Sequence, residues 1–168
     1  LIARAGEGSM RDAISILDQA VSGAPSKHIE KDAVLSMLGR PDMKRIGELV
    51  HAITTLDRKS APGIYRGVVS DGADPVQIMD DIAEMTHLAG LYLIDPELAS
   101  VTGTEDDARE TVAGIAGEAP GASFMSATRM LLETRPQITD GANRIQAGEV
   151  LVMRLVLGFQ RARKATGK

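Results

Sequence analysis

The clearest helix signal in this chain lies in residues 8–19, Gly8-Ser9-Met10-Arg11-Asp12-Ala13-Ile14-Ser15-Ile16-Leu17-Asp18-Gln19. Ser9 has a side chain suited to an N-cap, and Asp12 three positions later completes the S-x-x-D form of a capping box. The apolar residues that follow share one helical face, at Met10, Ala13, Ile14, Leu17 and Val21. We therefore predict a helix over residues 9–21.

Arg11 lies in the first turn of that helix, where a cation is disfavoured. The helix macrodipole opposes a positive charge there by about 0.3–1 kcal/mol, whereas the free backbone N–H groups of the same turn favour an anion. Two interpretations fit these facts. Arg11 is either a solvated side chain whose penalty is screened by water and salt, or one of the groups that hold an anion at this helix end.

The string G-S-M-R-D-A-I-S-I-L-D-Q resembles the lid-domain motif of the bacterial DNA polymerase III gamma/tau family, the AAA+ ATPase of the replicative clamp loader. In that family the arginine of the motif is the sensor-2 residue, which reaches the γ-phosphate of bound ATP. The resemblance implies this role for Arg11 and a place near the nucleotide for Met10. It also implies that the full-length protein loads the sliding clamp onto primed DNA in an ATP-dependent reaction during replication.

Helical periodicity continues along the rest of the chain, and the two-residue alternation typical of strands is not found. Residues 29–38 show the pattern of a short helix. Asp74 followed by Pro75 predicts the start of a longer helix, and Thr104 with Asp107 forms another capping box. The sequence thus predicts an all-α fold.

Two features concern the last two helices. A helix beginning at residue 121 meets Arg135 and Pro136, and we expect the proline to stop it there. In the final helix, Arg154 is the only polar residue among residues 150–157. We therefore expect this last helix to be buried almost all round.

The resemblance also gives a domain organisation. In the gamma/tau family the lid is followed by a helical collar domain through which the loader subunits assemble. Met37-Leu38-Gly39 resembles the end of the lid, and residues 149–154 are similar to a Glu-Met-x-Leu-Leu-Arg element of the last collar helix. We expect residues 1–39 to be the C-terminal part of an AAA+ lid domain and residues 40–168 to be a helical-bundle collar, or oligomerisation, domain.

The apolar stripe of the last helix has two interpretations. It forms part of the intramolecular core, or one side of it packs against a neighbouring collar. The candidate interface residues are Val150, Met153, Arg154 and Leu157. The basic tail at residues 161–168 is similarly open. Its cations favour a helix C-terminus, and they could also approach DNA or an acidic partner.

Composition excludes several classes of function. The net charge is -4, charges of both signs are interspersed, and the only aromatic residues are two Tyr and two Phe, so direct nucleic-acid binding is not expected. There is no Cys and no apolar run long enough to span a membrane. We expect a bacterial cytoplasmic protein, and because the chain starts at Leu1 we interpret it as part of a longer one.

No residue is predicted to be catalytic or to bind a metal. The chain has no Walker A loop and no Walker B strand, so ATP with Mg²⁺ is expected in the full-length protein and tight nucleotide binding is not expected here. The histidines are irregularly spaced, at His28, His51 and His87. A small cluster of carboxylates is formed by Asp80, Asp81 and Glu84, and we interpret it as a solvated acidic face.

The expected partners follow from the resemblance: other clamp-loader subunits through the collar, and the sliding clamp and primed DNA through the assembled loader. An alternative is a free-standing helical adaptor or scaffold without ATPase activity that merely contains a similar helix start. A third interpretation keeps an AAA+ lid but places it in a related loader subunit or a helicase. Asp18-Gln19 at the end of the motif favours gamma/tau over that third interpretation.

Overall fold

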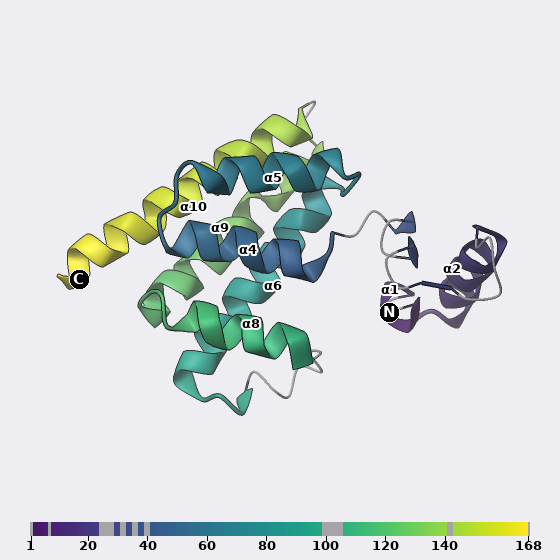
Figure 1. Cartoon of the computed structure of the whole chain (residues 1–168), viewed down its shortest axis with the longest axis horizontal. Coiled ribbons are helices and arrows are strands. Elements are labelled where there is room, and N and C mark those ends of the chain that lie inside the picture. Colours follow the sequence, from purple (N-terminus) through teal and green to yellow (C-terminus); the bar gives the residue numbers. More distant parts are fainter. Residues whose placement is uncertain are drawn as a thin grey trace.

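The computed structural model describes residues 2–6, 8–23, 29–30, 33–34, 37–38, 41–98, 106–140 and 143–167 (Figure 1). Within these ranges the regular elements are helices and no strand occurs, which confirms the all-α prediction. The helices are α1 (Ile2–Ala5), α2 (Met10–Gly23), α4 (Met43–Thr54), α5 (Ser60–Ser70), α6 (Pro75–Ile94), α8 (Asp106–Ala116), α9 (Gly121–Asp140) and α10 (Arg144–Thr166).

The helix predicted over residues 9–21 is α2, and Ser9 caps it. The Ser9 hydroxyl accepts a hydrogen bond from the Asp12 amide at 3.3 Å. The other half of a capping box does not form, because the Ser9 amide donates to the Gly6 carbonyl at 2.7 Å instead. This bond joins the end of α1 to the start of α2, and α1 packs against α2.

Helices α4 to α10 form a bundle around one hydrophobic core, and Figure 1 shows α1 and α2 to one side of it. In this bundle α6 pairs most extensively with α9 and also contacts α4, α8 and α10. The largest fully buried side chains include Tyr65, Phe124, Phe159, Ile46, Leu49, Ile53, Ile78, Met79, Ile82, Met85, Leu131 and Ile138.

The predicted start of the long helix at Asp74-Pro75 is confirmed. Asp74 is the N-cap of α6, and its carboxylate accepts a hydrogen bond from the Val76 amide at 2.7 Å. Pro75 occupies the first turn, where its missing N–H costs nothing. The boundary predicted at residues 39–40 lies outside the described residues, as do residues 31–32 and 35–36 of the short helix predicted at 29–38 and Thr104 of the second capping box.

The prediction that Pro136 stops a helix was wrong. The helix α9 continues through Pro136 to Asp140. A proline inside a helix removes one backbone hydrogen bond, but here tertiary contacts on both sides of it offset that loss. Ile138 beyond the proline is fully buried, and Arg135 before it binds Asp80 of α6. Packing against α6 therefore holds the last turn of α9 in place.

The prediction that the last helix is buried almost all round was also wrong. In α10 the buried residues share one face, at Gly148, Leu151, Val152, Leu155, Val156 and Phe159. Val150 is 54% exposed and Leu157 is 41% exposed on the other side. A continuous apolar run places side chains on every side of a helix, but only residues three or four positions apart share the side that reaches the core. The apolar residues between them therefore lie on the outward side of α10.

A close contact between α5 and α10 fixes the start of the last helix. Tyr65 is fully buried, and its hydroxyl donates a hydrogen bond to the Ile145 carbonyl at 3.1 Å. Gly148 lies directly against this ring, and a Cβ added there would collide with the Tyr65 hydroxyl. Burial, together with the negative charges of Glu149 and Asp74, raises the pKa of Tyr65 to about 12.

The raised pKa of Tyr65 predicts a loss of stability in alkali. An ordinary tyrosine has a pKa near 10 and ionises more readily in the unfolded chain than in this fold. The stabilisation is therefore fully present below pH 10 and is lost as the pH rises toward 12, by about 2–3 kcal/mol in total.

The measurement is urea unfolding at pH 8 to 12 for the parent chain and for Tyr65→Phe. The variant loses the hydrogen bond to Ile145, so we expect it to be less stable at neutral pH by about 1 kcal/mol. It should lack the alkaline decline that Tyr65 causes. Equal declines in both proteins would contradict the assignment to Tyr65.

Candidate functional site

The first candidate site is the N-terminal turn of α2, which carries Arg11. The Arg11 side chain is exposed, and no ion pair in the described part of the chain involves it. Its backbone carbonyl accepts a hydrogen bond from the Ser15 hydroxyl, a contact that does not involve the guanidinium. The structure thus places an exposed cation in the first turn of α2, the helix end whose backbone N–H groups favour an anion.

The apolar face predicted for α2 exists, but much of it faces outward. Met10 is 76% exposed, and Ile14, Leu17 and Val21 on the same side are also exposed. Ala20 is the residue of α2 that is fully buried, and Gly6 lies against Ala13 on the side that meets α1. Arg11 and the exposed stripe thus stand on one short helix, at whose start Met10 and Arg11 are neighbours.

The second candidate site is the outward side of α10. Val150, Arg154 and Leu157 are exposed and Met153 is half-buried. One turn away, Glu149 binds Arg66 of α5 through both carboxylate oxygens, at 2.6 and 3.1 Å. This ion pair joins α10 to α5, and the four predicted interface residues lie away from the buried face of α10.

The basic tail divides into one structural and two exposed cations. Arg163 donates hydrogen bonds to the carbonyl of Thr54 at 3.1 Å and to the carbonyl of Glu118 at 2.7 Å. It thereby binds the C-terminal ends of α4 and α8, where the helix dipoles favour a cation. Arg161 and Lys164 are exposed, and Lys168 lies outside the described residues. Sequence reasoning missed the role of Arg163, because its partners are distant in the chain.

Comparison with known proteins identifies the family. A family model described as DNA polymerase III subunits gamma and tau domain III matches residues 29–166, most of the chain. The chain belongs to this gamma/tau family. A second model, described as the ATPase lid domain of the DNA polymerase III clamp loader subunit, matches residues 1–24. In this gamma/tau chain Arg11 lies inside the lid match and α10 inside the domain III match.

Curated relatives carry the same family name. The gamma/tau subunit of Mycobacterium tuberculosis (strain H37Rv) is 36% identical over 84 residues, which is 50% of this chain and 14% of that protein. The tau subunit of Bacillus subtilis is 31% identical over 101 residues, 60% of this chain and 18% of that protein. The tau subunit of Escherichia coli is 27% identical over 96 residues, which is 57% of this chain and 15% of that protein. The match thus spans less than a fifth of each relative.

A solved structure shares the fold. The gamma/tau chain is similar to the Bacillus subtilis DNA clamp loader delta protein, with a TM-score of 0.59 at 15% sequence identity. The similarity covers 93% of this chain and 49% of that one. At this identity the comparison shows a common helical fold, and function has to be argued from the residues.

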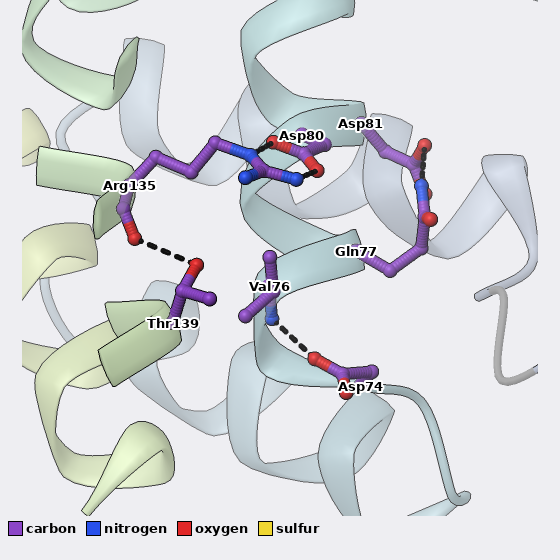
Figure 2. Close-up of polar contacts among 7 residues, drawn as sticks. All are labelled: Asp74, Val76, Gln77, Asp80, Asp81, Arg135 and Thr139. Atoms are coloured by element: carbon purple, nitrogen blue, oxygen red, sulfur yellow. Dashed lines mark hydrogen bonds and ion pairs between the residues drawn. The ribbon is translucent and has the colours of Figure 1, made fainter. Parts of the chain in front are cut away.

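The carboxylate cluster of α6 is not the solvated acidic face that the sequence predicts. Figure 2 shows Asp80 facing Arg135 of α9, whose guanidinium donates two hydrogen bonds to it at 2.7 and 2.9 Å. These bonds raise the pKa of Arg135. Asp81 is buried and accepts a hydrogen bond from Gln77 at 2.8 Å, and only Glu84 is exposed. Asp80 therefore joins α6 to α9 of the gamma/tau bundle, and Asp81 is held by a side chain of its own helix.

Two further findings limit the chemistry of the described residues. His, Asp and Glu side chains there form no group that could hold a metal ion. His51 and His87 are exposed, and His28 lies outside the described part. None of the described helices is both long and apolar enough to cross a bilayer.

The Arg135–Asp80 pair predicts a difference between two arginines of α9. Arg135→Ala should lower the free energy of unfolding by about 1 kcal/mol, because it breaks a two-bond ion pair between helices and leaves a half-buried carboxylate alone. Arg129→Ala is the matched control, since its 3.7 Å pair with Glu133 is exposed and lies within one helix. Urea unfolding at low salt measures both variants. Equal losses would contradict the role given to Asp80.

Proposed function

We propose that this chain supplies part of the ATPase lid and the collar of a DNA polymerase III clamp-loader subunit. The full-length protein would then load the sliding clamp onto primed DNA in an ATP-dependent reaction during replication. The observation that carries the proposal is the succession of two matches, the lid match at residues 1–24 and the domain III match at residues 29–166. The relatives named gamma/tau or tau support it.

Within this proposal Arg11 is the sensor-2 residue. A guanidinium is permanently charged and offers a planar fork of N–H donors, which suits phosphate oxygens. The described residues fit this role, because Arg11 is exposed and Ser9 already caps the Asp12 amide, so the side chain has no structural duty in α2. Since Arg11 stands on a rigid helix, a displacement of its guanidinium by a bound anion displaces the lid helix as well.

The nucleotide itself would be held mainly by parts of the full-length protein outside this chain. ATP with Mg²⁺, when bound, supplies the γ-phosphate charge that Arg11 recognises. Met10 precedes Arg11 and is almost fully exposed, so its thioether can pack beside the nucleotide. We expect this chain alone neither to hydrolyse ATP nor to bind it tightly.

The bundle would hold the loader subunits together. The outward side of α10 offers Val150, Met153, Arg154 and Leu157, an apolar stripe interrupted by one cation. Because the opposite face of α10 is buried in the core, the stripe is presented in one orientation. Its partners are other clamp-loader subunits, while the sliding clamp and DNA are contacted through the complete loader. As part of a bacterial replication protein, the chain would work in the cytoplasm.

The Arg11 role is tested in the full-length protein within the reconstituted loader. Arg11→Ala should reduce clamp-dependent ATP turnover by about tenfold or more, because a charge contact to the γ-phosphate is lost, with little change in ADP binding. Arg58→Ala is the control, since Arg58 is exposed in the turn after α4, far along the chain from the lid. Turnover that is equal in Arg11→Ala and Arg58→Ala would leave Arg11 an ordinary solvated residue and favour a helical scaffold.

The assembly role predicts opposite outcomes for two leucines of α10. Leu157→Glu should abolish assembly with the other loader subunits while preserving the far-UV helical signal, because Leu157 is 41% exposed. Leu155→Glu should unfold the bundle, because Leu155 is buried in the core and an unpaired charge there is costly. Gel filtration and circular dichroism measure both variants. Normal assembly by a folded Leu157→Glu variant contradicts this interface.

A further inference from the structure

A furrow runs along the antiparallel pair α9 and α10 and contains two successive hollows. The first, of about 270 Å³, is lined by Ala122, Ser126 and Met130 of α9 and by Gly158, Ala162 and Ala165 of α10, with smaller contributions from their neighbours. The second, of about 300 Å³, continues it past Thr134 and Ile138, opposite Val150 and Arg154. The furrow exists because small side chains face each other where two helices pack.

The first hollow is lined mostly by small and apolar side chains, whereas the second also has polar ones, among them Gln137, Asn143 and Gln146. The α10 edge of the furrow is basic: Arg154 lines the second hollow, and Arg161, two turns further along α10, lies on the same side of the helix. Both are exposed, and no ion pair in the described residues involves either of them. Residues 150–168 contain no Asp or Glu at all. Along the α9 edge, Arg129 and Glu133 pair with each other and cancel. An occupant should therefore combine apolar side chains with negative charge.

One further detail points to an occupant. Ser123 lines the first hollow, is buried, and its hydroxyl has no hydrogen-bond partner among the described residues. Buried hydroxyl groups are rarely left without a partner. A polar group entering the hollow would supply one.

The matching surface lies on the same chain, at the C-terminal end of α6. Ile94 is 71% exposed there, and Leu93 and Leu98 beside it are exposed as well. Asp95 and Glu97 lie between these residues and are exposed, while no Lys or Arg occurs in residues 88–98. The turn is well formed, because the Asp95 carboxylate accepts the Glu97 amide at 2.9 Å and the Leu98 amide donates to the Asp95 carbonyl at 3.0 Å.

We propose that the furrow between α9 and α10 receives this acidic, apolar α6 tip from a second copy of the chain. The proposal rests on the assembly role given above and names the two surfaces that meet. Ile94 and its apolar neighbours fill the first hollow, and Asp95 and Glu97 face Arg154 and Arg161. Because furrow and tip are different surfaces, each copy offers one of each, which permits assemblies larger than a dimer.

The observations favour a protein occupant over nucleic acid. Arginines alone would suit phosphates, but the first hollow beside them is lined mostly by small and apolar side chains, which a phosphate backbone does not fill. The occupant also needs exposed apolar groups next to carboxylates. The α6 tip has both within five consecutive positions.

Cross-linking tests the contact directly, because the chain contains no cysteine. One preparation carries Ile94→Cys and a second, differently tagged preparation carries Ser126→Cys; they are mixed and oxidised. We expect a disulfide between the two chains, with a yield about tenfold above that of Ile94→Cys mixed with Ser70→Cys, a control position exposed on α5. Mass spectrometry of the linked peptides identifies the joined positions.

Charge reversal supplies the second arm. Arg154→Glu with Arg161→Glu in the furrow copy should reduce the yield to the control level, and Asp95→Lys with Glu97→Lys in the tip copy should restore it. All these residues are exposed, and circular dichroism confirms that the variants fold. A cross-linking yield equal to that of the control would overturn the proposal, and so would a failure of the second charge reversal to restore the yield. It would also be overturned if the arginine variants lost binding to duplex DNA while the cross-link still formed. If only this contact fails while Leu157→Glu still blocks loader assembly, the proposed function stands.

Discussion

The burial of α6 is the constraint on which the rest of this structure depends. The helix contacts α4, α8, α9 and α10, and most of its residues from Ile78 to Gly90 are removed from water. A helix so enclosed must have its polar groups satisfied by neighbours. Thr86 does so by sharing a 2.9 Å hydrogen bond with Thr128 of α9, and Asp80 by binding Arg135. These contacts between α6 and α9 also hold α9 in helical form beyond Pro136.

The placing of α10 follows from the same packing. Its buried face lies against α9 and the helices around α6, with Phe159 and Phe124 in an edge-to-face contact at 5.3 Å between ring centres. Polar contacts then join α10 to the rest of the bundle near its start, through Tyr65 and Glu149, and near its end, through Arg163. Because only one face of α10 is packed in the core, the apolar residues on its other face are exposed and available to a partner.

Many of the exposed large apolar residues in the described part of the chain gather in three places. Those of α2 share the helix that carries Arg11, Val150 and Leu157 lie on the outward side of α10, and those at the end of α6 form the acidic tip. Exposed apolar groups gathered in this way are typical of surfaces that meet other proteins or other domains. The bundle is therefore organised as a packed core with apolar groups on its outer faces, and the exposed Arg11 stands on a separate helix pair.

The sequence by itself determined the helical class, the Ser9 cap of α2, the Asp74-Pro75 start of α6 and the family, because capping and periodicity are local and the lid motif is contiguous. Only the tertiary structure decided that α9 passes Pro136, that α10 exposes one side, that Asp80 joins α6 to α9 rather than facing water, and that Arg163 caps two other helices. Each of these depends on a partner far away in the chain. Local preferences cost about 1–3 kcal/mol, and burial of a neighbouring side chain is large enough to reverse them.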